Sequence, residues 1–121
     1  MTVRGIRGAT VVDRDEPAAI LAATCQLLEA ILAANQDLEP DDLASAWFTV
    51  THDLVSVHPA VAARRMGWTQ VPLMCSLEIP VPNSLPRCIR VLLHWNTALP
   101  QNAIQHVYLG AAAALRPDLA K

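Results

Sequence analysis

The stretch Cys88-Ile89-Arg90-Val91-Leu92-Leu93-His94-Trp95 has the β-branched, aromatic and other apolar residues of a buried strand, with one cation in its middle. Burying an unpaired charge is costly, so Arg90 needs either an internal carboxylate or a ligand that supplies an anion. From Leu54 to Pro117 the only acidic residue is Glu78, whereas the same stretch holds five arginines. This local excess of positive charge predicts a site that attracts a small polyanion.

Length and composition indicate one domain that associates with other copies of itself. The 121 residues suffice for one modest core, so we expect a single domain over residues 1–121. Apolar residues make up 53% of the chain and charged residues 17%, which leaves less polar surface than a small monomer usually exposes. The net charge of −2 argues against sequence-independent binding to nucleic acid or to an anionic membrane.

Cysteine usage and the amino-terminal sequence bear on the compartment. Cys25, Cys75 and Cys88 are odd in number and lack the paired spacing of a disulfide framework or a zinc site. The segment from Met1 to Arg7 is not an apolar leader, and no later run reaches the roughly 20 apolar residues that span a bilayer. We therefore expect reduced thiols and a cytoplasmic protein with no membrane partner.

Hydrophobic periodicity predicts two helices. Apolar residues from Ile20 to Leu32 recur at helical spacing, and Asp15 can cap this helix with Pro17 in its first turn. A short second helix, Ala60–Met66, can end at Gly67. The acidic stretch between the first helix and the next strand favours a connector with a short helical turn.

Five further segments favour strands, which gives an α+β fold class. The last of them is ambiguous, because Tyr108 and its neighbours favour a strand whereas the alanines after Gly110 have helical propensity; we predict a strand there. Five strands and a long helix make a sheet with one covered face. The predicted strands are Val3–Thr10, Ala46–Thr51, Val71–Ile79, Arg87–Asn96 and His106–Leu115.

Several kinds of chemistry are poorly supported by the residues. No serine lies on a nucleophile elbow, and the segment from Gly5 to Gly8 lacks the lysine and spacing of a phosphate loop. The remaining arginines, one isolated glutamate and one tyrosine suit a reaction that needs positioning and charge stabilisation, with no metal and no cofactor. The histidines lack metal-ligand spacing and are more typical of structural or surface roles: His52, His58, His94 and His106.

Five segments together carry a family resemblance. They are Arg4-Gly5-Ile6-Arg7-Gly8-Ala9-Thr10, Val71-Pro72 through Cys75 to Glu78, Cys88-Ile89-Arg90-Val91, His106-Val107-Tyr108-Leu109 and Leu115-Arg116-Pro117-Asp118-Leu119. In this order and spacing they resemble the AroH class of chorismate mutases, the trimeric type best known from bacilli. The resemblance implies a five-stranded mixed sheet with one long and one short helix. It also implies three copies forming a pseudo-α/β barrel, with active sites between subunits.

The same resemblance implies a reaction and the residues that carry it. Chorismate would rearrange to prephenate, a Claisen rearrangement that uses no acid, base, metal or cofactor. Arginines that match Arg7 and Arg90 bind the carboxylate of the ether bridge, and the second also faces the ether oxygen as its bond breaks. Positions that match Glu78 and Cys75 hold the ring hydroxyl, and one that matches Tyr108 contacts the same carboxylate as Arg7. Arg90 and Glu78 are thus the expected catalytic residues.

The remaining expected substrate-binding residues are more scattered. An arginine from the short helix of a neighbouring subunit falls on Arg64, which is adjacent to Arg65. His58 precedes Pro59 where the family usually has phenylalanine in the apolar wall of the site. Met74 and Leu115 complete the expected set.

Two other functions and one structural alternative stay open at this point. The chain could be an enzyme of the structurally related enamine and imine deaminase group, or a non-catalytic trimer that binds an aromatic carboxylate. Glu78 could also be a purely structural partner of Arg90. Strict alternation along a strand puts Cys75 and Glu78 on opposite faces, so both can contribute only if the strand twists or bends between them.

Overall fold

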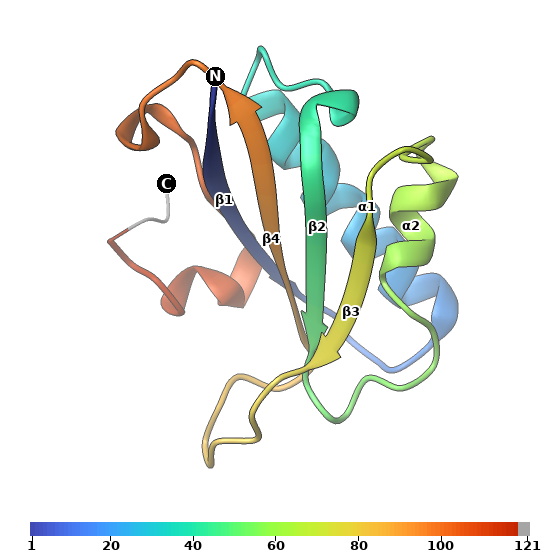
Figure 1. Ribbon diagram of the computed structural model, residues 1–121. Helices are drawn as coiled ribbons and strands as arrows, with labels where there is room; N and C mark the ends of the chain where they lie inside the picture. Colours follow the sequence, from blue (N-terminus) through green and yellow to red (C-terminus); the bar gives the residue numbers. More distant parts are fainter. Residues whose placement is uncertain (119–121) are drawn as a thin grey trace.

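The computed structural model describes residues 1–118, which form a five-stranded mixed sheet with two helices packed on one face (Figure 1). The strands are β1 (Thr2–Val11), β2 (Leu43–Val50), β3 (Leu73–Leu77), β4 (Cys88–Thr97) and β5 (Val107–Tyr108), and their spatial order is β3-β2-β4-β1-β5. The helices are α1 (Pro17–Ala34) and α2 (Ala60–Arg65), and 3-10 turns cover Pro40–Asp42, Gln101–Ala103 and Gly110–Ala114. The predicted fold class is confirmed.

Strand β4, which contains Arg90, is the central strand of the sheet. It pairs antiparallel with β1 from Thr2↔Thr97 to Val11↔Cys88, and antiparallel with β2 on its other edge. The outer pairs, β2 with β3 and β1 with β5, are parallel. Every residue of β4 therefore has a fixed neighbour on at least one side, which sets the position of its side chains across the sheet.

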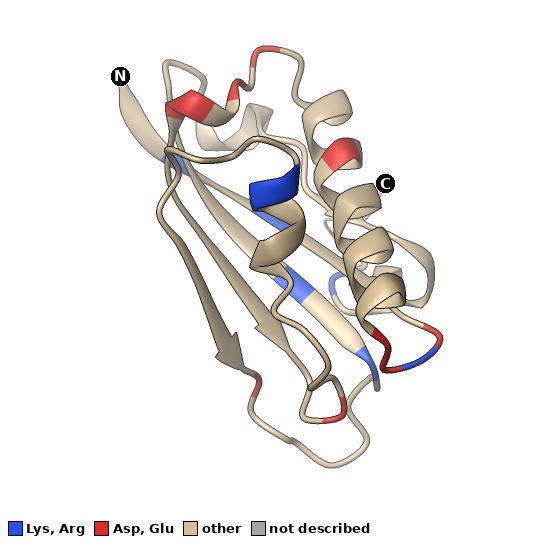
Figure 2. Ribbon diagram, turned by 90° about the vertical axis from the view of Figure 1, so that its right-hand side faces the viewer, with Lys and Arg blue, Asp and Glu red and all other residues tan. Residues whose placement is uncertain are grey.

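Alternation along β4 separates the core from the opposite face. Its odd-numbered residues from Ile89 to Thr97 are buried, and those from Val91 to Trp95 belong to the main apolar cluster under the helices. The even-numbered residues Arg90, Leu92 and His94 are half-buried on the other side. We call this second side, which carries neither α1 nor α2, the open face. Figure 2 shows the sheet on one side and both helices on the other.

The long helix α1 is strongly apolar. Its 18 residues have a mean hydropathy of 1.7, which satisfies the length and composition of a membrane-spanning helix. However, Ile20, Leu27 and Ile31 on one face are fully buried against the protein itself. We therefore interpret α1 as the core helix of this domain.

The prediction of a strand over His106–Leu115 is wrong for most of its length. Only Val107 and Tyr108 pair with β1, and Gly110–Ala114 forms a 3-10 helix. Gly110 has a φ of 57°, a left-handed conformation that breaks a strand and that glycine adopts at little cost. The alanines that follow lack the β-branched side chains that favour a strand.

Two smaller expectations also need correction. Asp15 does not cap α1, whose N-cap residue is Glu16 without a side-chain cap. The Asp15 carboxylate instead accepts the backbone N–H groups of Val55 and Ser56, both at 3.1 Å, and so ties down the loop after β2. Strand β3 is shorter than predicted. The three cysteines are free thiols, and Gly67 ends α2 with a φ of 92° as expected.

Side chains of α1 pack directly onto Gly8 of β1. A Cβ added there would lie 2.8 Å from Cδ1 of Ile31 and 3.2 Å from Cδ1 of Leu27, and both of these side chains are fully buried. We expect Gly8→Ala to lower the free energy of unfolding by about 1–3 kcal/mol, as overpacking of a core usually does. Denaturant unfolding at one fixed protein concentration measures this loss.

Gly5→Ala is the matched control on the same strand. Its Cβ would meet only Cδ1 of Leu92, at 3.7 Å, which is an ordinary contact. We expect a change of less than about 0.5 kcal/mol, typical of substitutions away from the core. Equal destabilisation by the two substitutions would contradict the close packing of α1 at Gly8.

Candidate active site

The pairing registers place one row of side chains across the open face. Ala9 lies opposite both Tyr108 on β5 and Arg90 on β4, and Arg90 lies opposite Thr49 on β2. Thr49 in turn lies opposite Ser76 on β3. Residues opposite one another in a sheet point to the same face. The Tyr108 phenol, the Arg90 guanidinium and the hydroxyls of Thr49 and Ser76 are therefore aligned in one row across the sheet. Ala9 of β1 lies between Tyr108 and Arg90.

Arg90 has a carboxylate nearby but is not hydrogen-bonded to it. Its Nε atom lies 3.7 Å from Oε2 of Glu78, and the two side chains are 28% and 24% exposed. The same Nε is buried and has no hydrogen-bond partner among the described residues. Charge-assisted hydrogen bonds between such groups are about 2.7–2.9 Å long. The two groups are thus close enough to attract each other, but the buried Nε of Arg90 is left without a hydrogen bond.

The other neighbours of Arg90 do not neutralise it either. Burial raises the pKa of the Cys88 thiol, although the nearby Arg90 opposes that shift. A thiol with a raised pKa is uncharged at neutral pH, so it offers no counter-charge. Glu78 itself accepts a hydrogen bond from the Thr49 hydroxyl through Oε2, the oxygen nearest Arg90.

A second row on the open face supplies Arg7 and an apolar wall. Arg7 lies opposite Leu92, which lies opposite Trp47, which lies opposite Met74. Trp47 and Met74 are 45% and 59% exposed. The indole is fixed by a hydrogen bond of 2.7 Å from its Nε1 to the Ser76 hydroxyl.

The two rows meet in one cavity on the open face. Its volume is about 230 Å³. Two arginines and one glutamate converge there, which gives the cavity the net positive charge that the sequence predicts. Its lining residues are Arg7, Trp47, Thr49, Glu78, Arg90, Val91 and Leu92.

Tyr108 and Leu115 lie on the same face beside this cavity. Tyr108 packs with Ala9, Cys88 and Ala112 in a small apolar cluster, and Leu115 packs against it. The Tyr108 hydroxyl is buried and has no hydrogen-bond partner among the described residues. A buried phenol without a partner is uncommon, so this hydroxyl is a second group that a ligand could satisfy.

Two other residues predicted to bind substrate, Cys75 and His58, line a separate cavity. Met74, also predicted, lies on the open face. The Cys75 side chain points to the helix side and packs against the main core, opposite to Glu78, as strict alternation requires. It lines a cavity of about 370 Å³ together with His58 and Pro59. Within one chain, therefore, Cys75 and His58 are not brought to Arg90.

Arg64 also lies away from the open face. Both Arg64 and Arg65 are exposed in the last turn of α2, on the helix side of the sheet (Figure 2). Arg64 lines a different cavity, with Trp68 and Leu73. One chain thus carries two groups of predicted residues on opposite faces.

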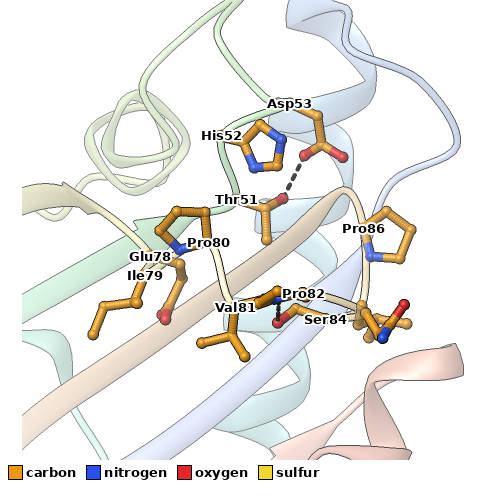
Figure 3. Close-up of a pocket in the computed structure, with 12 residues that line it drawn as sticks. Thr51, His52, Asp53, Glu78, Ile79, Pro80, Val81, Pro82, Ser84 and Pro86 are labelled. Atoms are coloured by element: carbon orange, nitrogen blue, oxygen red, sulfur yellow. Dashed lines mark hydrogen bonds between the residues drawn. The ribbon is translucent and has the colours of Figure 1, made fainter.

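A further cavity of about 210 Å³ lies under the loop between β3 and β4 (Figure 3). Half of its twelve lining residues are prolines or other apolar residues, and Glu78 is among the polar half. In Figure 3 the Glu78 side chain points away from His52 and Asp53. Asp53 is already engaged, since its carboxylate accepts the Thr51 hydroxyl and the backbone N–H of Arg87. We assign this cavity to the loop rather than to the site.

Sequence reasoning missed Thr49 and Trp47. Both lie on β2, a predicted strand, but nothing in the local sequence indicated which of its residues oppose Arg90. The pairing register between β2 and β4 places these two residues beside Arg90 and Leu92, and this register is seen only in the structure. Two of the histidines are hydrogen-bonded within the fold: His94 pairs with the Ser45 hydroxyl at 2.8 Å, and Nδ1 of His106 accepts the backbone N–H of Arg7 at 2.9 Å. Within residues 1–118, no cluster of His, Cys, Asp or Glu could hold a metal.

Comparison with known proteins supports the resemblance over nearly the whole chain. Residues 3–119 match the family model of chorismate mutase type I. The chain is 55% identical to chorismate mutase AroH of Thermus thermophilus, over 97% of this chain and 96% of the relative. It is 46% identical to chorismate mutase AroH of Bacillus subtilis (strain 168), over 98% of this chain and 94% of that one.

A solved structure agrees with both the sequence and the fold. The chorismate mutase from Clostridium thermocellum superposes with a TM-score of 0.88 at 49% sequence identity, covering 91% of this chain and 97% of that one. Family model, sequence relatives and fold therefore coincide over the region that holds Arg7, Glu78, Arg90 and Tyr108. The chain belongs to the chorismate mutase type I family.

Proposed function

We propose that this protein rearranges chorismate to prephenate in aromatic amino-acid biosynthesis, at a site centred on Arg90. The observation that carries the proposal is the buried Nε of Arg90, which faces a cavity with no hydrogen-bond partner among the described residues. Two arginines in one cavity suit a dicarboxylate. A Claisen rearrangement breaks one bond and forms another in a concerted step, so it needs no acid, base or metal from the protein.

Arg90 has the geometry for charge stabilisation. During the rearrangement the ether bond breaks and its oxygen gains negative charge. A donor already oriented toward that oxygen lowers the barrier, because the protein does not have to reorganise as the charge develops. Central position in the sheet, with strands on both sides, restrains the backbone of Arg90.

The other residues serve binding and restraint. In this proposal Arg7, from the neighbouring row, shares a carboxylate with Arg90, and the Tyr108 hydroxyl contacts the same group; the register of Arg7 and the buried, unpartnered hydroxyl support these roles. Glu78, on the far side of Arg90, can accept the ring hydroxyl. Holding the flexible ether bridge in a reactive conformation supplies a further part of the rate enhancement.

The site is completed by a second copy in this proposal. Arg64, His58 and Cys75 lie away from Arg90 in one chain, so they can serve one substrate together only if another subunit brings its helix-side residues to the open face. The exposed Trp47 and Met74 on that face fit a surface that is covered on assembly. We propose a cytoplasmic homotrimer with its sites between subunits.

A direct assay tests the function. Purified protein should convert chorismate to prephenate without added metal or cofactor, and the loss of chorismate can be followed by its absorbance. An enamine or imine substrate should not be hydrolysed. Binding of chorismate without any prephenate would instead favour a non-catalytic protein and would overturn the proposal.

Replacing Arg90 tests the mechanism. We expect Arg90→Ala to lower the turnover rate by at least roughly 10²- to 10³-fold, as the loss of one preorganised donor does. The loss should appear in kcat as well as in KM, because the interaction strengthens in the transition state. Arg90→Lys should remain strongly impaired, since it keeps the charge but loses the planar fork.

Arg14→Ala is the matched control. Arg14 is a mostly exposed arginine that pairs with Glu16 and does not line the cavity, so its replacement should leave turnover near that of the wild type. Each variant is checked for folding and assembly before its rate is measured. A folded Arg90→Ala protein with kcat within about threefold of wild type, which raises the barrier by only about half of what a tenfold loss does, would refute this mechanism.

A further inference from the structure

Thr49 stands between the two candidate catalytic side chains. It lies directly opposite Arg90 in the β2–β4 pair. On its other side the ladder of β2 with β3 continues past the end of the strand, because the Glu78 N–H donates to the Val50 carbonyl at 2.9 Å. Glu78 is therefore held beside Thr49, and the Thr49 hydroxyl donates to its Oε2.

The Thr49 hydroxyl donates a hydrogen bond to Oε2 of Glu78, the oxygen to which Arg90 would otherwise donate. The same Oε2 lies 3.7 Å from the Arg90 Nε, which is longer than a hydrogen bond. Without the Thr49 proton, the carboxylate could move onto the guanidinium and form a closed ion pair. Such a pair would satisfy both groups internally and would leave neither for a ligand.

The second carboxylate oxygen of Glu78, Oε1, remains available to a ligand. Among the described residues no donor reaches Oε1, whereas Oε2 is engaged by Thr49. A carboxylate fixed through one oxygen has only the other to offer to a ligand hydroxyl. Thr49 also lines the cavity that holds Arg7, Glu78 and Arg90.

We propose that Thr49 is a positioning residue that holds Glu78 away from Arg90 and leaves Oε1 free for the substrate hydroxyl. This inference rests on the proposed function of the same site. The hydroxyl of Thr49 is the part that matters, and its methyl group contributes only to the shape of the strand.

Two substitutions separate the hydroxyl from the shape. Thr49→Val keeps the β-branched side chain and removes the donor, whereas Thr49→Ser keeps the donor. We expect kcat/KM for chorismate to fall roughly 10- to 100-fold in Thr49→Val, the range that corresponds to losing a hydrogen bond to a charged group. Thr49→Ser should stay within about threefold of wild type, a change well below one tenfold step.

A double-mutant cycle with Glu78→Ala identifies the partner. If Thr49 acts through the Glu78 carboxylate, then adding Thr49→Val to Glu78→Ala should cause no further loss of kcat/KM. A purely structural role would lower stability and give a loss that adds to that of Glu78→Ala. Thr49→Ala, which also lacks the hydroxyl, must reproduce the behaviour of Thr49→Val.

The outcomes distinguish this inference from the proposed function. Impaired Glu78→Ala with an unimpaired Thr49→Val, or additive losses in the cycle, would overturn the role of Thr49 alone. A Glu78→Ala protein as active as wild type would overturn the role of Glu78 and the role of Thr49 with it. A wild-type protein that leaves chorismate unchanged would overturn the function on which both depend.

Discussion

The guanidinium of Arg90 is held in the middle of the central strand, with a carboxylate near it but not bonded to it. This constraint explains much of what surrounds it. The strand must be central for the charge to be restrained, and the small side chain of Ala9 separates it from Tyr108 in the same row. Thr49 restrains Glu78 on the other side. A closed Arg90–Glu78 pair would be easier to bury, but it would leave no group for an anionic ligand.

The second constraint is that the sheet has two different faces. One is covered by α1 and α2 and holds the main core, and it carries Cys75, His58 and Arg64 near its margins. The other carries the charged cavity and the exposed Trp47 and Met74. A single chain therefore carries the predicted site residues in two separate groups. In the proposed trimer, association of copies covers the exposed apolar side chains and joins the two groups.

The sequence predicts the parts whose cause is local. The apolar period of α1, the stop at Gly67 and the buried character of β4 follow from residue type and spacing. The family motifs point to Arg7, Glu78 and Arg90, which line one cavity in the structure. The parts that depend on pairing could not be found this way. The opposition of Thr49 and Arg90 is a matter of register, and the early end of β5 depends on one left-handed glycine followed by alanines.

The most direct test of a site shared between subunits is complementation between two inactive variants. One is Arg90→Ala, and the other combines Arg64→Ala with Arg65→Ala, so that each lacks one half of the site. When the two are unfolded, mixed in equal amounts and refolded together, random assembly should restore about a quarter of the sites, since each intact site needs one unaltered half from each of two neighbours. The predicted result is activity near that fraction for the refolded mixture as a whole, which corresponds to one intact site in each mixed trimer. Mixed trimers that stay as inactive as the separate variants would contradict the account.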